Sequence, residues 1–322
     1  MTPVQIGTSD PLFILAPPLA CSWKLCAALG QHPQMYALPE THLFTAQSVA
    51  EWLQLSSASS FAMDHGLLRA LAELIYGEQT ESTIQLAAAW LLRRSHVTTA
   101  FVLETLAERA HPRLLVEKSP SIVYDVKSMR RAHLMFPHAR FLYVVQHPRA
   151  YGEIIVGMLR EMSKAGPLAT SHWLMQLACM PAMTEKGEAM TAGVEVDPQR
   201  PWYVLNRTIC DFLDTVSEHQ KTWIRAEALR TSPDVVLQKI IAWMNLDLIP
   251  ERIEAMRHPE RSPFSGLGPA NACFGTDLFL PQPELALDSR DLYSLEGPLS
   301  WHSGRQTFAL EVKQLAQKFG YS

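Results

Sequence analysis

The 322-residue sequence lacks the long runs of similar residues that mark membrane proteins and nucleic-acid-binding proteins. No uninterrupted apolar run approaches the roughly 20 residues of a membrane-spanning helix, so we expect no membrane segment. No cluster of lysine and arginine stands out, and the formal net charge is −4, so no face could neutralise many phosphates. We therefore expect neither nucleic acid nor a membrane as a partner.

Cysteine, phosphate-loop and metal patterns are also missing. The five cysteines are odd in number and never form a CxxC pair, which excludes a disulfide framework and a zinc knuckle and predicts a reducing, cytoplasmic location. No spacing of histidine, cysteine or carboxylates matches a metal site, so no metal is predicted. The motif Gly-x-x-x-x-Gly-Lys-Ser/Thr is absent, so hydrolysis of a nucleoside triphosphate is not supported.

What the sequence does contain is a series of short apolar runs separated by helical patterns, within 48% hydrophobic residues overall. The runs that predict buried strands are Leu12–Ala16, Arg113–Glu117, Arg140–Gln146 and Lys221–Arg225. The segments that predict helices between and after them are Ser22–Gln31, Tyr124–Phe136, Pro233–Asn245 and Arg305–Phe319. Strands separated by helices imply right-handed crossovers, so we predict a single α/β domain over residues 1–322 with a central parallel sheet.

Two longer regions interrupt this alternation. Apolar residues recur at helical spacing across residues 46–110, which predicts several packed helices forming an insertion or cap. Residues 258–283 are rich in proline and glycine and lack periodicity, so they predict a long ordered loop. Loops of that length usually serve a site, and we predict an active-site loop here.

Ligands of an open parallel sheet bind beyond the carboxyl ends of its strands, where three loops are expected to converge: residues 17–24, 117–121 and 146–150. The first loop places Ser22 near a helix N-terminus, where free N–H groups and the helix dipole favour an anion. The alternative is a plain strand-to-helix turn capped by Ser22. Spacing alone leaves both interpretations open.

Several motifs, taken together and in order, resemble those of sulfotransferases that use 3′-phosphoadenosine-5′-phosphosulfate (PAPS), and are most similar to the sulfotransferase domains of polyketide and olefin synthases. They lie at residues 16–22, 31–44, 117–121, 134–149 and 258–264. The resemblance covers nearly the whole chain. It implies a sulfotransferase-like, P-loop-type three-layer fold. It also implies a role in polyketide-type biosynthesis, acting on a hydroxyl-bearing acyl substrate that is free or held by an acyl carrier protein.

The same resemblance exposes a deficit at the donor site. Where the family places a cation and a glycine in the first loop, this chain has Leu19 and Cys21, and only Ser22 is kept. Where the family places an arginine and a serine after the third strand, this chain has Gln146 and Ile154. Losing two charge-assisted contacts at about 1.5–3 kcal/mol each would weaken PAPS binding about 10²- to 10⁴-fold.

PAPS is therefore expected as a cofactor only if other cations compensate. Lys24, Arg149 and Arg160 are the candidates, although an exposed lysine is the preferred interpretation of Lys24. The residues that we predict at the cofactor end of the site are Ser22, Lys24, Ser119, Gln146 and Arg149.

Three residues are candidates for the acceptor chemistry. Glu40 matches the position where related sulfotransferases place a carboxylate that deprotonates a hydroxyl. His258 falls where polyketide-type members have a histidine, and imidazole transfers protons near neutral pH. Lys118 follows a strand end and could steady a transferring group. The alternatives are a surface carboxylate, a loop histidine and a solvated lysine; His42 and His147 are further candidates from the same loops.

The sequence leaves three functions open. The preferred hypothesis is an enzyme that descended from a sulfotransferase and uses the pocket for acyl or proton-transfer chemistry without PAPS. The alternatives are orthodox sulfonation of a hydroxyl and a non-catalytic protein that binds a carrier protein. A separate hypothesis is that Cys21, at a helix N-terminus and near His147, is a nucleophilic thiol; a buried apolar filler is its alternative.

Overall fold

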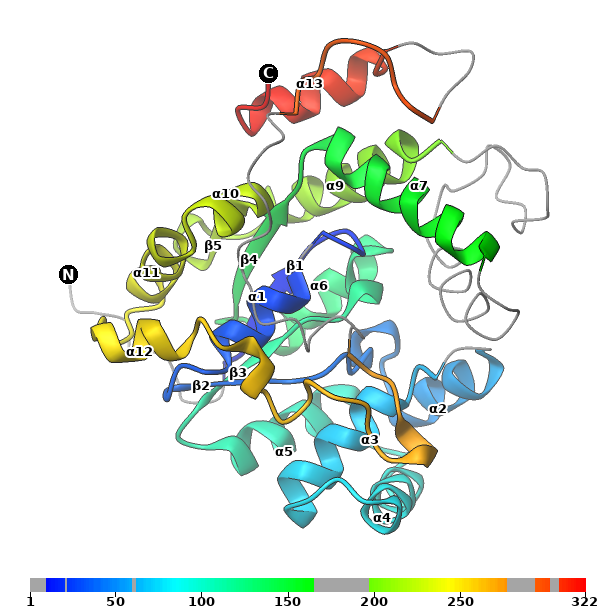
Figure 1. Cartoon of the computed structure of the whole chain (residues 1–322). Coiled ribbons are helices and arrows are strands. Elements are labelled where there is room, and N and C mark those ends of the chain that lie inside the picture. Colours follow the sequence, from blue (N-terminus) through cyan, green and yellow to red (C-terminus); the bar gives the residue numbers. More distant parts are fainter. Residues whose placement is uncertain (1–9, 21, 60–61, 165–196, 277–292, 302–306) are drawn as a thin grey trace.

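A five-stranded parallel sheet forms the centre of the protein (Figure 1). The computed structural model describes residues 10–20, 22–59, 62–164, 197–276, 293–301 and 307–322. The strands are β1 (Leu12–Leu15), β2 (Met35–Ala37), β3 (Leu114–Glu117), β4 (Arg140–Val145) and β5 (Lys221–Arg225). They lie in the order β2-β3-β1-β4-β5, and every neighbouring pair is parallel.

The predicted central parallel sheet is confirmed, and four of its five strands are the four predicted apolar runs. The register places Leu12 of β1 opposite both Val116 of β3 and Arg140 of β4. The chain crosses from one side of β1 to the other between β3 and β4. Sequence analysis missed β2, which pairs with β3 over only three residues.

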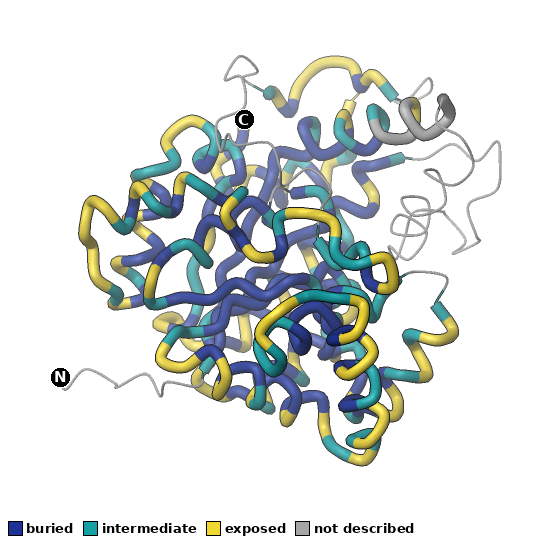
Figure 2. Tube along the Cα trace, turned by 60° about the horizontal axis from the view of Figure 1, so that its bottom comes forward, coloured by how far each residue is buried: buried dark blue, intermediate teal, exposed yellow. Residues whose placement is uncertain are grey.

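Both faces of the sheet are buried along the central strands β1, β3 and β4, which is why these strands are nearly continuous apolar runs (Figure 2). In the edge strand β5 only Ile224 is buried. Alternate residues of β1 belong to two separate hydrophobic clusters, with Phe13 and Leu15 in one and Leu12 and Ile14 in the other. The protein therefore has three layers.

Different helices complete the two clusters. On the Leu12 face lie α1 (Ser22–Leu29), α10 (Ala226–Thr231), α11 (Pro233–Trp243) and α12 (Pro250–Ala255). On the Phe13 face lie α2 (Val49–Ala58), α3 (His65–Leu71), α4 (Glu81–Leu92), α5 (Thr99–Ala110), α6 (Val126–Met135), α7 (Pro148–Lys164), α9 (Gln199–Leu213) and α13 (Leu310–Lys318).

The region 46–110 contains α2 to α5, with a π-helical turn at Ala72–Tyr76 directly after α3. Local sequence sets where these helices begin. Ser48, Thr80 and Thr98 each accept a hydrogen bond from a backbone N–H of the first turn, and so cap α2, α4 and α5. Figure 1 shows these four helices gathered beneath the β2 edge of the sheet.

Two expectations near the C-terminus need adjustment. The region 258–283 contains two short 3-10 turns, η5 (Pro259–Arg261) and η6 (Ala270–Ala272), and its residues 277–283 lie outside the described part. The last helix begins at Leu310, later than the predicted start at residue 305, because the backbone at Ala309 is still extended.

Within the described ranges, no helix has both the length and the apolar character needed to cross a bilayer. The same ranges contain no group of three histidine, cysteine or carboxylate side chains placed to hold a metal ion.

Candidate functional site

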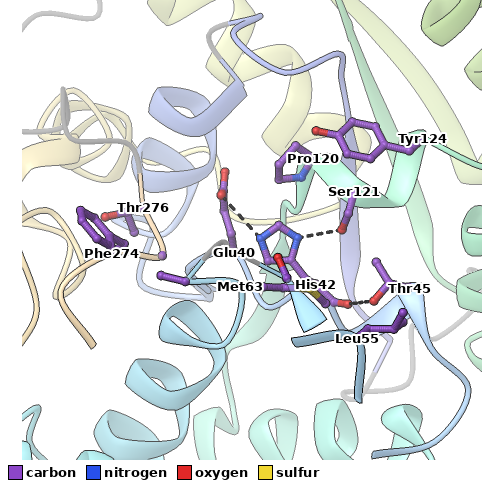
Figure 3. Close-up of a pocket in the computed structure, with 13 residues that line it drawn as sticks. Glu40, His42, Thr45, Leu55, Met63, Pro120, Ser121, Tyr124, Phe274 and Thr276 are labelled. Carbon is purple, nitrogen blue, oxygen red and sulfur yellow. Dashed lines mark hydrogen bonds and ion pairs between the residues drawn. The ribbon is translucent and has the colours of Figure 1, made fainter. Parts of the chain in front are cut away.

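A cavity of about 370 Å³ opens at the carboxyl ends of β2 and β3, where ligands of parallel sheets bind. Its walls come from the loop after β2, the loop after β3, helix α2 and the loop before residue 277 (Figure 3). The lining residues are Glu40, His42, Thr45, Leu55, Ser59, Ala62, Met63, Pro120, Ser121, Tyr124, Phe274, Gly275 and Thr276. Most of these are apolar or aromatic, so the cavity suits an acyl chain.

The polar end of the cavity is built around Glu40. Lys118 Nζ lies 2.7 Å from Glu40 Oε1, and His42 Nε2 lies 3.8 Å from Glu40 Oε2. The three side chains are 7–16% exposed, so the interactions are largely shielded from water. The structure thus brings together two of the predicted catalytic residues, Glu40 and Lys118, and adds His42.

His42 is held firmly in place. Its Nδ1 lies 2.7 Å from Ser121 Oγ, its backbone N–H donates to Ser119 Oγ, and its carbonyl accepts from Trp52 Nε1 and Thr45 Oγ1. The backbone of His42 has a left-handed conformation with φ of 53°. Burial lowers the pKa of His42; Glu40 opposes this effect and Lys118 adds to it. The imidazole is therefore mainly neutral near pH 7.

A buried carboxyl group, Glu117, lies beneath this loop at the end of β3. Its Oε1 accepts hydrogen bonds from Thr41 Oγ1 at 2.9 Å and from Ser119 Oγ, while Oε2 has no partner among the described residues. Burial raises the pKa of Glu117 to about 7, although the bonds from Ser119 and Thr41 act in the opposite direction. Ser119 is thus fully used in connecting Glu117 to the backbone of His42.

The wall opposite β3 comes from a distant part of the chain. The Glu40 N–H donates to the Gly275 carbonyl at 2.8 Å, and the Phe274 N–H donates to His65 Nδ1 at 3.2 Å. Gly66 and Gly275 allow these segments to touch, because a Cβ on Gly66 would lie 2.1 Å from the Glu40 carbonyl oxygen. A Cβ on Gly275 would lie 2.3 Å from the Gly66 Cα.

Buried Arg69 holds the same wall from behind. Its guanidinium donates to Gln79 Oε1 and to the carbonyls of Phe274 and Gly266. Burial lowers the pKa of Arg69 to about 10, so the side chain remains charged at neutral pH. Two of these hydrogen bonds, to Phe274 and Gly266, therefore fix the loop that closes the cavity.

The predicted cofactor end lies at the carboxyl ends of β1 and β4. Ser22, Gln146 and His147 are buried there, and Ser22 Oγ, Gln146 Oε1 and His147 Nε2 have no partner among the described residues. Burial lowers the pKa of His147 to about 4, and Arg149 adds to this effect, so the ring is neutral. The Tyr293 ring stacks on it with centroids 5.6 Å apart.

Two of the cations considered for the cofactor end, Lys24 and Arg149, contact other groups of the protein. Lys24 is buried, 7% exposed, with Nζ 5.2 Å from the centroid of the Trp23 ring, so the expectation of an exposed lysine is wrong. Arg149 donates to the carbonyls of residues 294 and 296–298. Its guanidinium therefore holds a loop near the C-terminus.

The third predicted catalytic residue lies elsewhere. His258 precedes η5, its side chain is one-third exposed, and its Nδ1 lies 2.8 Å from Glu260 Oε1. Among the described residues that line the cavity, His258 is not present. Cys21 lies outside the described residues.

Sequence analysis did not single out Ser121 or Glu117 as site residues, and it predicted an active-site loop at residues 258–283 without naming Phe274. A charged residue at the end of an otherwise apolar buried strand is unusual, and that signal marks Glu117. No local pattern marks Ser121 or Phe274, because their neighbours come from segments about 80 and 200 residues away.

The sequence matches the model of the sulfotransferase family over residues 11–250. The chain therefore belongs to this family, as the motifs predicted. Comparison with curated protein sequences finds no match.

Two solved structures show the same fold along almost the whole length. One is the sulfotransferase domain from the curacin biosynthetic pathway, with a TM-score of 0.72, 21% identity and coverage of 97% of this chain and 98% of that domain. The other is the sulfotransferase domain from the Synechococcus PCC 7002 olefin synthase, with a TM-score of 0.69, 23% identity and coverage of 100% and 98%. The predicted sulfotransferase-like α/β fold is confirmed.

Proposed function

We propose that this protein catalyses an acyl-transfer or proton-transfer reaction on a hydroxyl-bearing acyl substrate that an acyl carrier protein presents. The reaction takes place in the Glu40 cavity and does not use PAPS. The observation that carries this proposal is the contrast between the two ends of the site. The acceptor end has a carboxylate, a paired lysine and a neutral imidazole around an apolar cavity. The donor end offers buried polar atoms, and Arg149, the arginine considered for it, already donates to backbone carbonyls.

The acceptor end suits general base catalysis. An acyl chain would lie against Leu55, Met63 and Phe274, with its hydroxyl near Glu40. The Glu40 carboxylate accepts the hydroxyl proton, and Lys118 steadies the charge that moves during the transfer. A positioned base of this kind contributes about 10²- to 10⁴-fold in rate.

The residues present do not fit PAPS. A nucleotide with several negative charges needs cations, yet Leu19 and Gln146 occupy the positions of the family's cations and Arg149 already binds four carbonyls. Tyr293 and Tyr321 also cover the ring of His147, at the end of β4. We therefore route no step through PAPS.

Calorimetric titration with adenosine 3′,5′-bisphosphate tests this part of the proposal. We expect no binding in the micromolar range, because two missing charge-assisted contacts weaken it about 10²- to 10⁴-fold. The orthodox alternative, sulfonation with PAPS, is favoured by one observation: the Ser22 hydroxyl at the start of α1 has no hydrogen-bond partner in the described part of the chain. A micromolar dissociation constant would establish that alternative.

A β-hydroxyacyl pantetheine thioester tests the acceptor chemistry, with the products identified by mass spectrometry. We expect turnover by the wild type and a loss of about 10²-fold or more in kcat for Glu40→Gln. Glu108→Gln, on the exposed face of α5, is the matched control and should keep the wild-type rate. A wild-type rate for Glu40→Gln would show that Glu40 is not the base, and no turnover by the wild type would favour a non-catalytic, carrier-binding protein.

A further inference from the structure

A serine, a histidine and a glutamate meet in the cavity in a connected order. Ser121 Oγ lies 2.7 Å from His42 Nδ1, and the other ring nitrogen of His42 faces Glu40 Oε2 at 3.8 Å (Figure 3). All three side chains line the same cavity. A hydroxyl bonded to an imidazole, with a carboxylate beside the other ring nitrogen, is the arrangement that activates a serine nucleophile. Here the carboxylate lies beyond hydrogen-bond distance of the neutral ring and within ion-pair distance of the protonated ring.

We propose that Ser121 accepts the acyl group of a thioester as a covalent ester, with His42 as its base and Glu40 as the carboxylate that stabilises the imidazolium formed when His42 takes the serine proton. The inference rests on the proposed function, because it takes an acyl thioester as the occupant of the cavity. It adds a nucleophile and a reaction type, which is acyl transfer or hydrolysis through a serine ester.

The first half of the reaction forms the ester. Ser121 Oγ attacks the carbonyl carbon of the thioester, and its proton passes to His42 Nδ1. The bond between carbon and sulfur breaks, and the departing thiolate takes this proton from His42. The products are an ester on Ser121 and a free thiol.

The second half releases the acyl group. A hydroxyl group of the acceptor, or water, attacks the ester carbon and gives its proton to His42. The bond between that carbon and Ser121 Oγ breaks, and the serine oxygen takes the proton back. The enzyme is restored, and the acyl group leaves as a new ester or as a free acid.

The state and position of His42 suit this role. The neutral ring that burial favours leaves Nδ1 able to accept the serine proton when Nε2 carries the hydrogen toward Glu40. Its backbone is held on both sides, by Ser119 at the N–H and by Trp52 at the carbonyl. The imidazole therefore needs no rearrangement before the reaction.

Two neighbouring serines differ in a way that separates a structural role from a chemical one. Ser119 is buried, donates to Glu117 and accepts from His42 N–H, so its hydroxyl is fully used in the fold. Ser121 is only partly buried and lines the cavity, and its hydroxyl points at the ring of His42. Only the second serine can reach a substrate.

An alkyl fluorophosphonate tests the nucleophile without knowledge of the natural substrate. It forms a bond from serine oxygen to phosphorus and releases fluoride, and the adduct is read by intact mass and peptide mapping. We expect one adduct per wild-type chain, at Ser121, none for Ser121→Ala, and wild-type labelling for Ser57→Ala on the surface of α2. Labelling of His42→Gln should be at least 100-fold slower.

An acyl pantetheine thioester, quenched with acid, provides the second readout. An acyl adduct on Ser121 supports the proposal, and Ser121→Cys, which keeps a nucleophile at this position, should also be acylated. The proposal is overturned if neither reagent modifies Ser121 in the wild type, or if Ser121→Ala, shown by its melting temperature to be folded, is modified equally.

The proposed function and the nucleophile fail in different ways. If Glu40→Gln abolishes turnover of the β-hydroxyacyl thioester while Ser121→Ala keeps the wild-type rate, the nucleophile is wrong and the proposed function stands. If the fluorophosphonate labels Ser121 but wild-type protein does not turn over the thioester, Ser121 is a nucleophile and the proposed substrate is wrong.

Discussion

Replacing Glu117 by glutamine should change how stability depends on pH. The folded protein keeps a proton on Glu117 up to a pKa of about 7, whereas the unfolded chain loses it near 4.5, because burial disfavours the charged form. The contribution of this carboxyl to stability is therefore complete below pH 4.5 and is lost as the pH rises through 7. At about 1.4 kcal/mol per pKa unit, the loss is about 3 kcal/mol.

Urea unfolding near pH 4.5 and near pH 8 measures this effect. Glutamine has nearly the same shape and does not titrate, so Glu117→Gln should gain about 3 kcal/mol over the wild type between the two conditions. Glu104→Gln, on the exposed side of α5, is the control and should follow the wild-type profile. Parallel profiles for Glu117→Gln and the wild type would show that Glu117 is ionised in the folded protein and refute the reasoning.

Three further changes test the cavity wall. Arg69→Met removes a buried cation together with the three hydrogen bonds that it donates. The free energy of unfolding, measured by urea unfolding, should fall by about 2–3 kcal/mol. Gly275→Ala should destabilise the protein more than Gly77→Ala in the same assay. Both glycines have a positive φ, but only a Cβ at position 275 would collide with backbone atoms, those of Gly66. Met63→Trp fills part of the cavity and should raise KM for long acyl thioesters roughly tenfold, with little change for acetyl thioesters, in steady-state kinetics. A shared increase for both chain lengths would contradict the placement of the acyl chain.

The central strands were predictable because they are buried on both faces. Continuous apolar runs such as Arg140–Val145 leave no other interpretation once helices separate them. Strand β2 escaped because three residues, Met35–Ala37, are too few to show a pattern, and its place in the sheet depends on pairing with β3. Sequence analysis did not single out the π-helical turn at Ala72–Tyr76 either.

The candidate site was predictable in part: Lys118 follows the predicted strand β3, whereas Glu40 was proposed only from the resemblance to the family, because β2 was missed. Glu40 and Lys118 come after β2 and β3, and adjacent parallel strands place such residues side by side, here 2.7 Å apart. The direction of a side chain in an irregular loop is not encoded in spacing. For that reason the sequence could not show that His258 pairs with Glu260, or that Ser121 faces the His42 ring.

The contact between Gly66 and Gly275 should make the cavity one of the first parts of the protein to open when the protein unfolds partially. The two segments are more than 200 residues apart in sequence, and the Phe274 N–H reaches His65 across the same separation. Such a long-range junction opens at a lower free energy than the central strands, since few bonds secure it. Turnover of the thioester should therefore be lost at denaturant concentrations that leave the circular dichroism signal of the helices unchanged.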